Sequence, residues 1–187
     1  DFYFKENVTW SALSSGGISL RYSASGSIFD TKGQCIFTDT VDDLYFYMAI
    51  LNSNAAIEFM SILAPTLDFN AGSIAKVPIS KDHNYLEIVE NSKKLVCQSK
   101  LIWDLSELSV NFKVNKMFAL RDEDGKCVSS FKEYVKESEK CTGFLKSLEV
   151  ANNSLISSMY GLRDEIDADV PLTKITVDVN PYYRYGG

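Results

Sequence analysis

The residues best suited to chemistry lie close together in the first part of the chain. Ser14, Ser15 and Arg21 flank the doublet Gly16-Gly17, and Ser11 lies shortly before it. Hydroxyl and guanidinium groups hydrogen-bond to base edges and phosphates, and a glycine loop without side chains can approach a DNA groove closely. The pattern therefore favours a surface that reads DNA. An ordinary polar rim of a β-hairpin would contain the same residues, and the sequence leaves both interpretations open.

Lysines in the same region are suited to hold the DNA backbone. We expect Lys5, Lys32 and Lys76 to contact phosphates, which position a protein on a duplex without specifying sequence. The formal net charge is −6, however, whereas a domain that binds DNA by itself usually carries a basic patch. We therefore expect weak DNA binding by this chain in isolation, with another domain supplying most backbone contacts.

Motifs for catalysis are missing or out of context. No glycine-rich turn after a parallel strand is present to bind S-adenosylmethionine. Asn180-Pro181-Tyr182-Tyr183 is similar to the loop that amino-methylating enzymes place at the target nitrogen, but it lacks the second proline and follows no βαβ pattern. Asp122, Asp124 and Lys126 are clustered as in a nuclease, yet their Asp-Gly sequence is better explained as a turn. We expect no catalytic residue in this chain.

The metal-ligating residue types are too sparse and dispersed for a closed site. His83 is the only histidine, and we expect it to be a solvated residue at a helix start. The cysteines are far apart and form no C-x-x-C pair; they are Cys35, Cys97, Cys127 and Cys141. Free cytosolic thiols are the simpler interpretation, so no metal is expected.

The elements that must position these residues begin with short strands. Alternation over residues 18–22 and apolar runs at 27–29 and 34–37 predict a strand, a turn and a hairpin. Thr40, with Asp43 three residues later, resembles a capping box and predicts a helix, and Asn52-Ser53-Asn54 separates it from a second helix over 55–63. Residues 66–79 predict irregular chain with one short strand.

The second half of the sequence predicts helices. Apolar spacing indicates an amphipathic helix over residues 84–105, interrupted around Glu90-Asn91. A long helix or helical hairpin is expected over 131–159, with Gly143 as its weak point. The tail to Gly187 has no expected core-forming element and looks truncated.

These elements predict an α+β fold in three parts. Residues 1–80 form a β-rich module with a helical pair, residues 81–165 a mainly helical spacer, and residues 166–187 a truncated tail. No apolar run approaches the roughly 20 residues of a membrane span, so we expect no membrane contact and a cytoplasmic protein. The chain begins at Asp1 without an initiator Met or secretory signal, which favours an internal fragment.

Several segments together resemble the C-terminal half of the adenine-specific methyltransferases of BREX phage-defence systems, of the PglX type, and of type IIG restriction-modification enzymes. Each segment is short, and their order and spacing carry the resemblance across most of the chain. Residues 102–112 are similar to a family stretch but depart from it at Ile102 and Leu108. The other segments are 8–11, 14–21, 28–30, 35–37, 51–53, 65–70, 74–79, 159–165 and 180–186.

The resemblance implies a catalytic domain elsewhere in the parent polypeptide that methylates adenine with S-adenosylmethionine. Because the target base must be flipped from the stack, such an enzyme needs a second surface to hold and read the duplex. This chain would be that target-recognition surface, with no cofactor and no activity of its own. Its expected partners are double-stranded DNA, the catalytic domain of the same polypeptide and other subunits of the defence complex. The alternative is a protein-interaction module of that complex which never touches DNA, and the acidic charge favours it.

Overall fold

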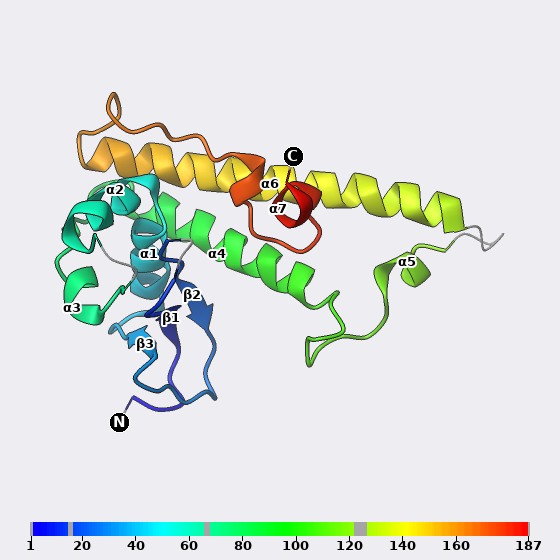
Figure 1. Cartoon of the computed structure of the whole chain (residues 1–187), viewed down its shortest axis with the longest axis horizontal. Coiled ribbons are helices and arrows are strands. Elements are labelled where there is room, and N and C mark those ends of the chain that lie inside the picture. The colour runs from blue at the N-terminus through cyan, green and yellow to red at the C-terminus, as the bar shows by residue number, and fades with distance from the viewer. Residues whose placement is uncertain (1, 15–16, 66–67, 122–126, 187) are drawn as a thin grey trace. The chain divides into compact units, whose positions relative to one another are not determined.

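A computed structural model describes residues 2–14, 17–65, 68–121 and 127–186. The expected α+β class is confirmed, because a three-stranded antiparallel sheet is combined with a majority of helical elements (Figure 1). The chain forms two compact units: unit 1 comprises Asp1–Lys93 with Ala151–Ala168, and unit 2 comprises Lys94–Val150 with Asp169–Gly187. The strands are β1 (Asn7–Ser11), β2 (Arg21–Ser23) and β3 (Gly33–Ile36). The helices are α1 (Val41–Leu51), α2 (Asn54–Leu63), α3 (Ala71–Ile74), α4 (Tyr85–Trp103), α5 (Lys116–Ala119), α6 (Cys127–Met159), the 3-10 turn η1 (Leu172–Lys174) and α7 (Pro181–Tyr185).

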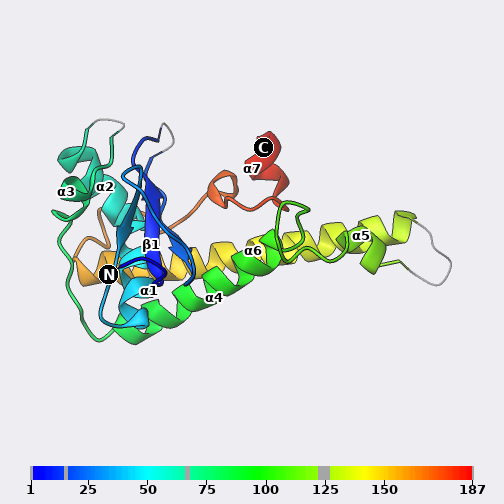
Figure 2. The same cartoon turned by 90° about the horizontal axis from the view of Figure 1, so that it is seen from below.

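The sheet of unit 1 is built around a strand that the sequence analysis did not predict. β1 is central and pairs antiparallel with β2 on one side and β3 on the other. Val8 and Trp10 of β1 point into the core, while Thr9 and Ser11 point the other way, as the two-residue period of a strand requires. Helix α1 contacts β1 and β2 (Figure 2). The sheet therefore has one face packed on a helix and one polar face.

Two of the expected strands differ from the structure. The strand expected over 18–22 begins only at Arg21, because the backbone of Leu20 is engaged elsewhere. Its N–H donates to Asn52 Oδ1 at 2.8 Å, and Asn52 Nδ2 donates to its carbonyl at 2.9 Å. The strand expected over 27–29 is wrong: these residues connect β2 to β3, which flank β1 on opposite sides.

The helical pair is confirmed. Thr40 caps α1 by accepting a hydrogen bond from the Asp43 N–H, and Ser53 caps α2 by accepting one from the Ala56 N–H. Residues 66–67 lie outside the described part of the chain. The rest of the stretch expected to be irregular contains α3, whose cap is the side chain of Asn70.

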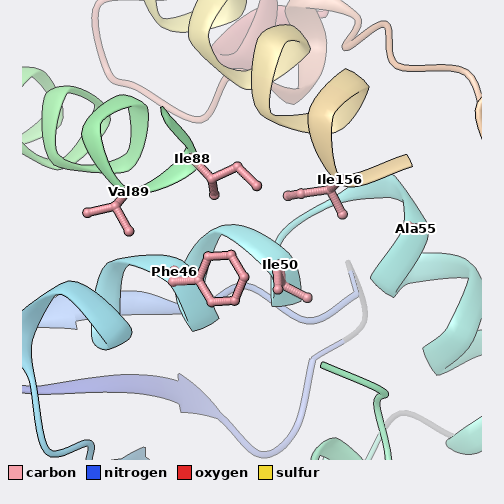
Figure 3. Packing of buried hydrophobic residues seen from close by; sticks show 6 residues of the cluster. All are labelled: Phe46, Ile50, Ala55, Ile88, Val89 and Ile156. Carbon is pink, nitrogen blue, oxygen red and sulfur yellow. The ribbon is translucent and has the colours of Figure 1, made fainter. Parts of the chain in front are cut away.

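The main core of unit 1 joins four helices. Figure 3 shows its side chains converging from α1, α2, α4 and α6. Burial of this apolar surface is the main force that fixes the helices around the sheet. A hydrogen bond also joins α2 to α6, because the Asn54 N–H donates to Asn153 Oδ1 at 3.0 Å. The fully buried side chains of this core are Phe46, Ile50, Ala55, Ile88, Val89 and Ile156.

The second half of the chain corrects two expectations. α4 runs without the interruption expected at Glu90-Asn91. The long helix, one of the two forms expected for residues 131–159, is confirmed as α6, which continues through Gly143. Glycine costs a helix only about 1 kcal/mol, which packing of the neighbouring turns offsets. The tail contributes to a core, because Val170 and Ile175 are buried together with Ile102 and Leu145.

Glu149 on α6 is an unusual carboxylate. Burial raises its pKa to about 7, and no hydrogen bond or ion pair to it occurs in the described part of the chain. In the unfolded chain the carboxylate ionises near its ordinary pKa of 4.5. As pH rises from that value to about 7, the unfolded state loses its proton first, so the stability of unit 2 should fall over this window and level off above it.

We therefore expect Glu149→Gln to raise the free energy of unfolding at pH 8 by about 1 to 3 kcal/mol and to flatten the pH profile. Urea unfolding at a series of pH values measures this change. Glu139→Gln on the exposed side of the same helix is the matched control and should leave the profile as it is. An unchanged profile in Glu149→Gln would contradict the buried environment described here.

Candidate DNA-contacting surface

The polar face of the sheet places hydroxyl groups around Arg21. The strand register sets Thr9 opposite Arg21 of β2 and opposite Cys35 of β3, so the three side chains share one face. Ser11 and Ser23 lie on the same face by the alternation of their strands. We call the side chains of Thr9, Ser11, Arg21, Ser23 and Cys35 the open face. Ser11 and Arg21 are exposed and the other three are half-buried, while Asn7, which shares the face by alternation, is buried.

Arg21 is held in place but keeps most of its donors free. Its Nη2 donates to Ser11 Oγ at 3.1 Å, in an exposed position. No carboxylate pairs with Arg21 among the residues that the structure describes. A guanidinium group has five N–H donors in a planar fork, so several remain for a ligand in a fixed orientation.

The glycine loop that follows β1 is described only in part. Ser14 is half-buried and Gly17 is exposed, whereas Ser15 and Gly16 lie outside the described residues. Gly17 has φ +90 and open space around it, so a side chain there would meet no neighbour but would strain the backbone. Before the loop, Leu13 forms an isolated bridge with Asp68, which places a second chain segment beside this end of β1.

Of the three expected phosphate contacts, one lies close to the open face. The Lys32 carbonyl accepts a hydrogen bond from the Ala12 N–H at 3.4 Å, next to the end of β1. Asp30 Oδ1 accepts from the Lys32 N–H at 2.8 Å and from the Gly33 N–H at 2.9 Å, and these bonds hold the pKa of Asp30 below its ordinary value.

The other two lysines lie elsewhere in unit 1. Lys5 precedes the opposite end of β1, six residues from Ser11, which corresponds to roughly 20 Å of extended chain. Its Nζ is 5.6 Å from the ring centroid of Phe2. Lys76 is exposed just after α3, and its N–H donates to the Ser73 carbonyl. The structure therefore places Arg21 and Lys32 at the sheet and Lys5 before the opposite end of β1, while Lys76 follows α3.

The acidic charge of the chain is concentrated in unit 1. Acidic residues outnumber basic ones two to one there, whereas unit 2 is close to neutral. Lys81 pairs with Asp43, and Lys93 pairs with Asp42 at 2.9 Å. The four cationic side chains expected to contact DNA form no ion pair with any residue in the described ranges. They are Lys5, Arg21, Lys32 and Lys76.

Ser11 was a candidate from the sequence alone, whereas Thr9 and Ser23 were not, because β1 was not predicted. Once β1 is recognised, the polar side chains at alternate positions of Asn7–Ser11 identify its outer face. Trp10 and Tyr22 are aromatic residues near the candidate site that could stack on a base, but neither lies on that face. Trp10 is 2% exposed and its Nε1 donates to the Phe69 carbonyl at 2.8 Å. Tyr22 stacks on Tyr45 with ring centroids 5.2 Å apart, and burial raises the pKa of its hydroxyl.

Asn180, which begins the segment similar to a methyltransferase loop, has a structural role. It is fully buried, and its Nδ2 donates to the carbonyls of Leu172 at 2.7 Å and Ile175 at 2.8 Å. Its Oδ1 accepts from the Tyr182 N–H at 3.1 Å and caps α7. All polar atoms of this side chain are therefore committed to the fold of unit 2.

Features of other functional classes are few. His83 is a solvated side chain 3.8 Å from Asp82, and Asp122, Asp124 and Lys126 lie outside the described residues. The described ranges contain no group of three His, Cys, Asp or Glu residues that could hold a metal ion.

Within the same ranges no single helix is long and apolar enough to cross a membrane. The one pair whose combined length and composition would suffice, α1 with α2, is bent by 71°.

Comparison with known proteins identifies relatives. No family model matches the chain. The adenine-specific methyltransferase PglX of Lacticaseibacillus casei (strain Zhang) is 33% identical over 194 residues, covering 98% of this chain and 16% of that protein. The adenine-specific methyltransferase BrxX of Escherichia coli O9:H4 (strain HS) is 33% identical over 188 residues, covering 100% of this chain and 15% of that protein.

The chain thus spans less than a fifth of the length of the relatives it matches. The resemblance inferred from the sequence is confirmed to this extent, while the target-recognition role stays a prediction. Over its whole length, the chain is homologous to one part of the adenine-specific methyltransferases PglX and BrxX.

Proposed function

We propose that this chain is the DNA target-recognition part of an adenine-specific DNA methyltransferase of a BREX-type phage-defence system. In this proposal it selects the sequence, and another part of the same polypeptide binds S-adenosylmethionine and transfers the methyl group to adenine. The chain itself holds no cofactor. Its partners are double-stranded DNA and the catalytic part of the enzyme.

The observation that carries the proposal is the arrangement of Arg21 on the open face. The guanidinium lies beside Ser11 and opposite Thr9. Among the described residues no carboxylate forms an ion pair with it, so its positive charge is available to a ligand. The major groove admits a β-ribbon, and a planar fork of donors matches the O6 and N7 acceptors of guanine. The hydroxyl groups of Ser11 and Ser23 add short donors and acceptors for neighbouring base edges, whereas the Thr9 hydroxyl donates to the Gln34 carbonyl at 2.9 Å and can only accept.

The acidic surplus of unit 1 is compatible with a division of labour. Contacts to phosphates supply affinity and register, whereas contacts to base edges supply specificity. A recognition part can therefore carry few lysines if the rest of the enzyme holds the backbone. The homologous methyltransferases are more than five times longer than this chain, which leaves ample protein for that task.

Arg21→Ala should loosen sequence choice at one position of the methylated motif. Loss of a bidentate contact to guanine costs about 1 to 3 kcal/mol of discrimination. Genome-wide mapping of methylated adenines in cells that carry the full-length enzyme measures the motif. Arg163→Ala, which removes another exposed arginine of unit 1, is the matched control and should leave the motif unchanged. A folded Arg21→Ala enzyme with an unaltered motif and rate would remove Arg21 from the reading surface.

Lys32→Ala should weaken binding to every DNA sequence alike. A phosphate contact releases counterions, so its loss should reduce the salt slope of binding by about one unit. Binding of the full-length enzyme to specific and unrelated duplexes at several salt concentrations measures both effects. A change confined to the specific duplex would instead assign Lys32 to base recognition.

A second candidate, a protein-interaction module of the defence complex, is favoured by the surplus of acidic residues in unit 1. It makes the opposite prediction for the open face. Substitutions at Arg21, Ser14 and Ser15 would all leave the methylated motif unchanged, and the loop would then be an ordinary hairpin rim.

A further inference from the structure

Unit 1 carries an exposed apolar patch whose rings contact one another. Phe2 packs on Phe37 with ring centroids 4.9 Å apart, and Phe29 packs on Tyr3 at 5.1 Å and on Phe37 at 5.4 Å. Phe4 follows Tyr3 in the sequence, and Ile28 precedes Phe29. The apolar patch, as we use the term, consists of Phe2, Tyr3, Phe4, Ile28, Phe29 and Phe37.

The patch is held in shape by its backbone. The Phe4 N–H donates to the Ser27 carbonyl at 3.0 Å, and the Gly26 N–H donates to the Phe4 carbonyl at 3.1 Å. Between these bonds Phe4 has φ +66, in the left-handed region that a phenylalanine rarely adopts. Such a conformation persists only where the surroundings fix it, and it is common at ligand and partner sites. The patch is therefore a formed surface joining two segments of the chain.

Its exposure is large for side chains of this size. Phe2, Phe4 and Ile28 are each more than half exposed, and Ile28 reaches 69%. Single exposed apolar residues are normal on a protein surface, but contiguous groups of them mark sites of interaction. The patch is thus incomplete without a covering surface.

We propose that another part of the same longer polypeptide covers this patch. The homologous methyltransferases extend far beyond the region they share with this chain, which makes up 15 to 16% of their length. Most of such a polypeptide lies outside these residues and is always present at high effective concentration. An apolar surface on that remainder would bury the rings and fix unit 1 against it. This inference is independent of the proposed role in DNA recognition.

A nucleic acid fits the patch less well. Bases stack on flat ring faces, but the contacting rings are tilted against one another by 39° to 53°, so they form no common flat face. Ile28 is aliphatic and offers no stacking surface. The surplus of acidic residues in unit 1 also disfavours phosphates, although Lys5 Nζ lies 5.6 Å from the centroid of the Phe2 ring.

Hydroxyl-radical labelling of the full-length polypeptide tests the proposal, with the same polypeptide unfolded in urea as the reference. We expect Phe2, Phe4 and Phe29 to be labelled about tenfold more slowly in the folded than in the unfolded protein, because covering side chains shield them from solvent. Rates within about threefold of the unfolded reference would match the exposure seen here and would overturn the proposal.

Two matched substitutions separate covering of the patch from general folding. Ile28→Gln should raise the labelling of Phe2 and Phe29 in the folded full-length protein, whereas Ile62→Gln, at a position 78% exposed on α2, should leave it unchanged. Equal effects of both variants would count against the proposal. Protection that appears only when duplex DNA is added would assign the patch to nucleic acid. Protection that grows with protein concentration would assign it to a second copy of the chain, and either result would replace the intramolecular surface.

Discussion

Trp10→Ala is expected to lower the free energy of unfolding of unit 1 by about 3 to 5 kcal/mol. The indole lies almost completely buried on the inner face of the central strand, and its N–H donates to the Phe69 carbonyl. Removing it opens a cavity beneath the sheet and leaves that carbonyl without its donor. Urea unfolding followed by circular dichroism measures the loss.

Trp10→Phe separates the two contributions. It keeps most of the apolar volume but removes the N–H donor, so we expect a smaller loss of about 1 to 3 kcal/mol. If Trp10→Ala cost less than about 1 kcal/mol, the residue would not be the core side chain described here, since core truncations of this size are far more costly. The case for Trp10 as a base-stacking residue would then reopen.

Asn180→Ala is expected to destabilise unit 2 by about 3 kcal/mol, because one buried side chain makes three hydrogen bonds. Its loss removes the cap of α7 and one of the two donors to each of the carbonyls of Leu172 and Ile175, which keep their bonds from the N–H groups of Ile175 and Val177. Asn115→Ala is the matched control: this exposed asparagine caps α5 through one bond at 3.0 Å, and its loss should cost about 1 kcal/mol. Equal costs in urea unfolding would contradict the structural role of Asn180.

The longer helices, α1, α2, α4 and α6, could be predicted from the sequence because their signals are local, whereas the short α3, α5 and α7 were not predicted. The cap at Thr40, the break at Asn52-Ser53 and the apolar period of α4 and α6 each lie within a few residues. The sheet could not be predicted in the same way. β1 has only Val8 and Trp10 as inward apolar residues, and its partners are β2 and β3, which are distant in sequence. Leu20 reads as part of a strand, yet it pairs with a side-chain amide 32 residues away.

The candidate site shows the same division. The residue types around Gly16-Gly17 identified Arg21 from sequence, but the hydroxyl groups beside it depend on the register of β1. The lysines illustrate the opposite error. Lys5, Lys32 and Lys76 were grouped by type, whereas Lys32 lies at the end of β1 that carries Ser11 and Lys5 lies before the opposite end. The core made by Val170 and Ile175 had no regular spacing to reveal it.

The most direct test of target recognition is an exchange of this segment between enzymes. The homologous segment of the Escherichia coli BrxX protein would be replaced by residues 1–187, and methylated adenines would be mapped genome-wide in cells that carry the chimera. If the chain selects the sequence, the chimera should methylate adenine in a motif different from that of the unaltered protein, and Arg21→Ala in the chimera should relax one position of the new motif. Methylation by the chimera in the unaltered motif, with Arg21→Ala silent, would contradict the assignment of sequence selection to this chain.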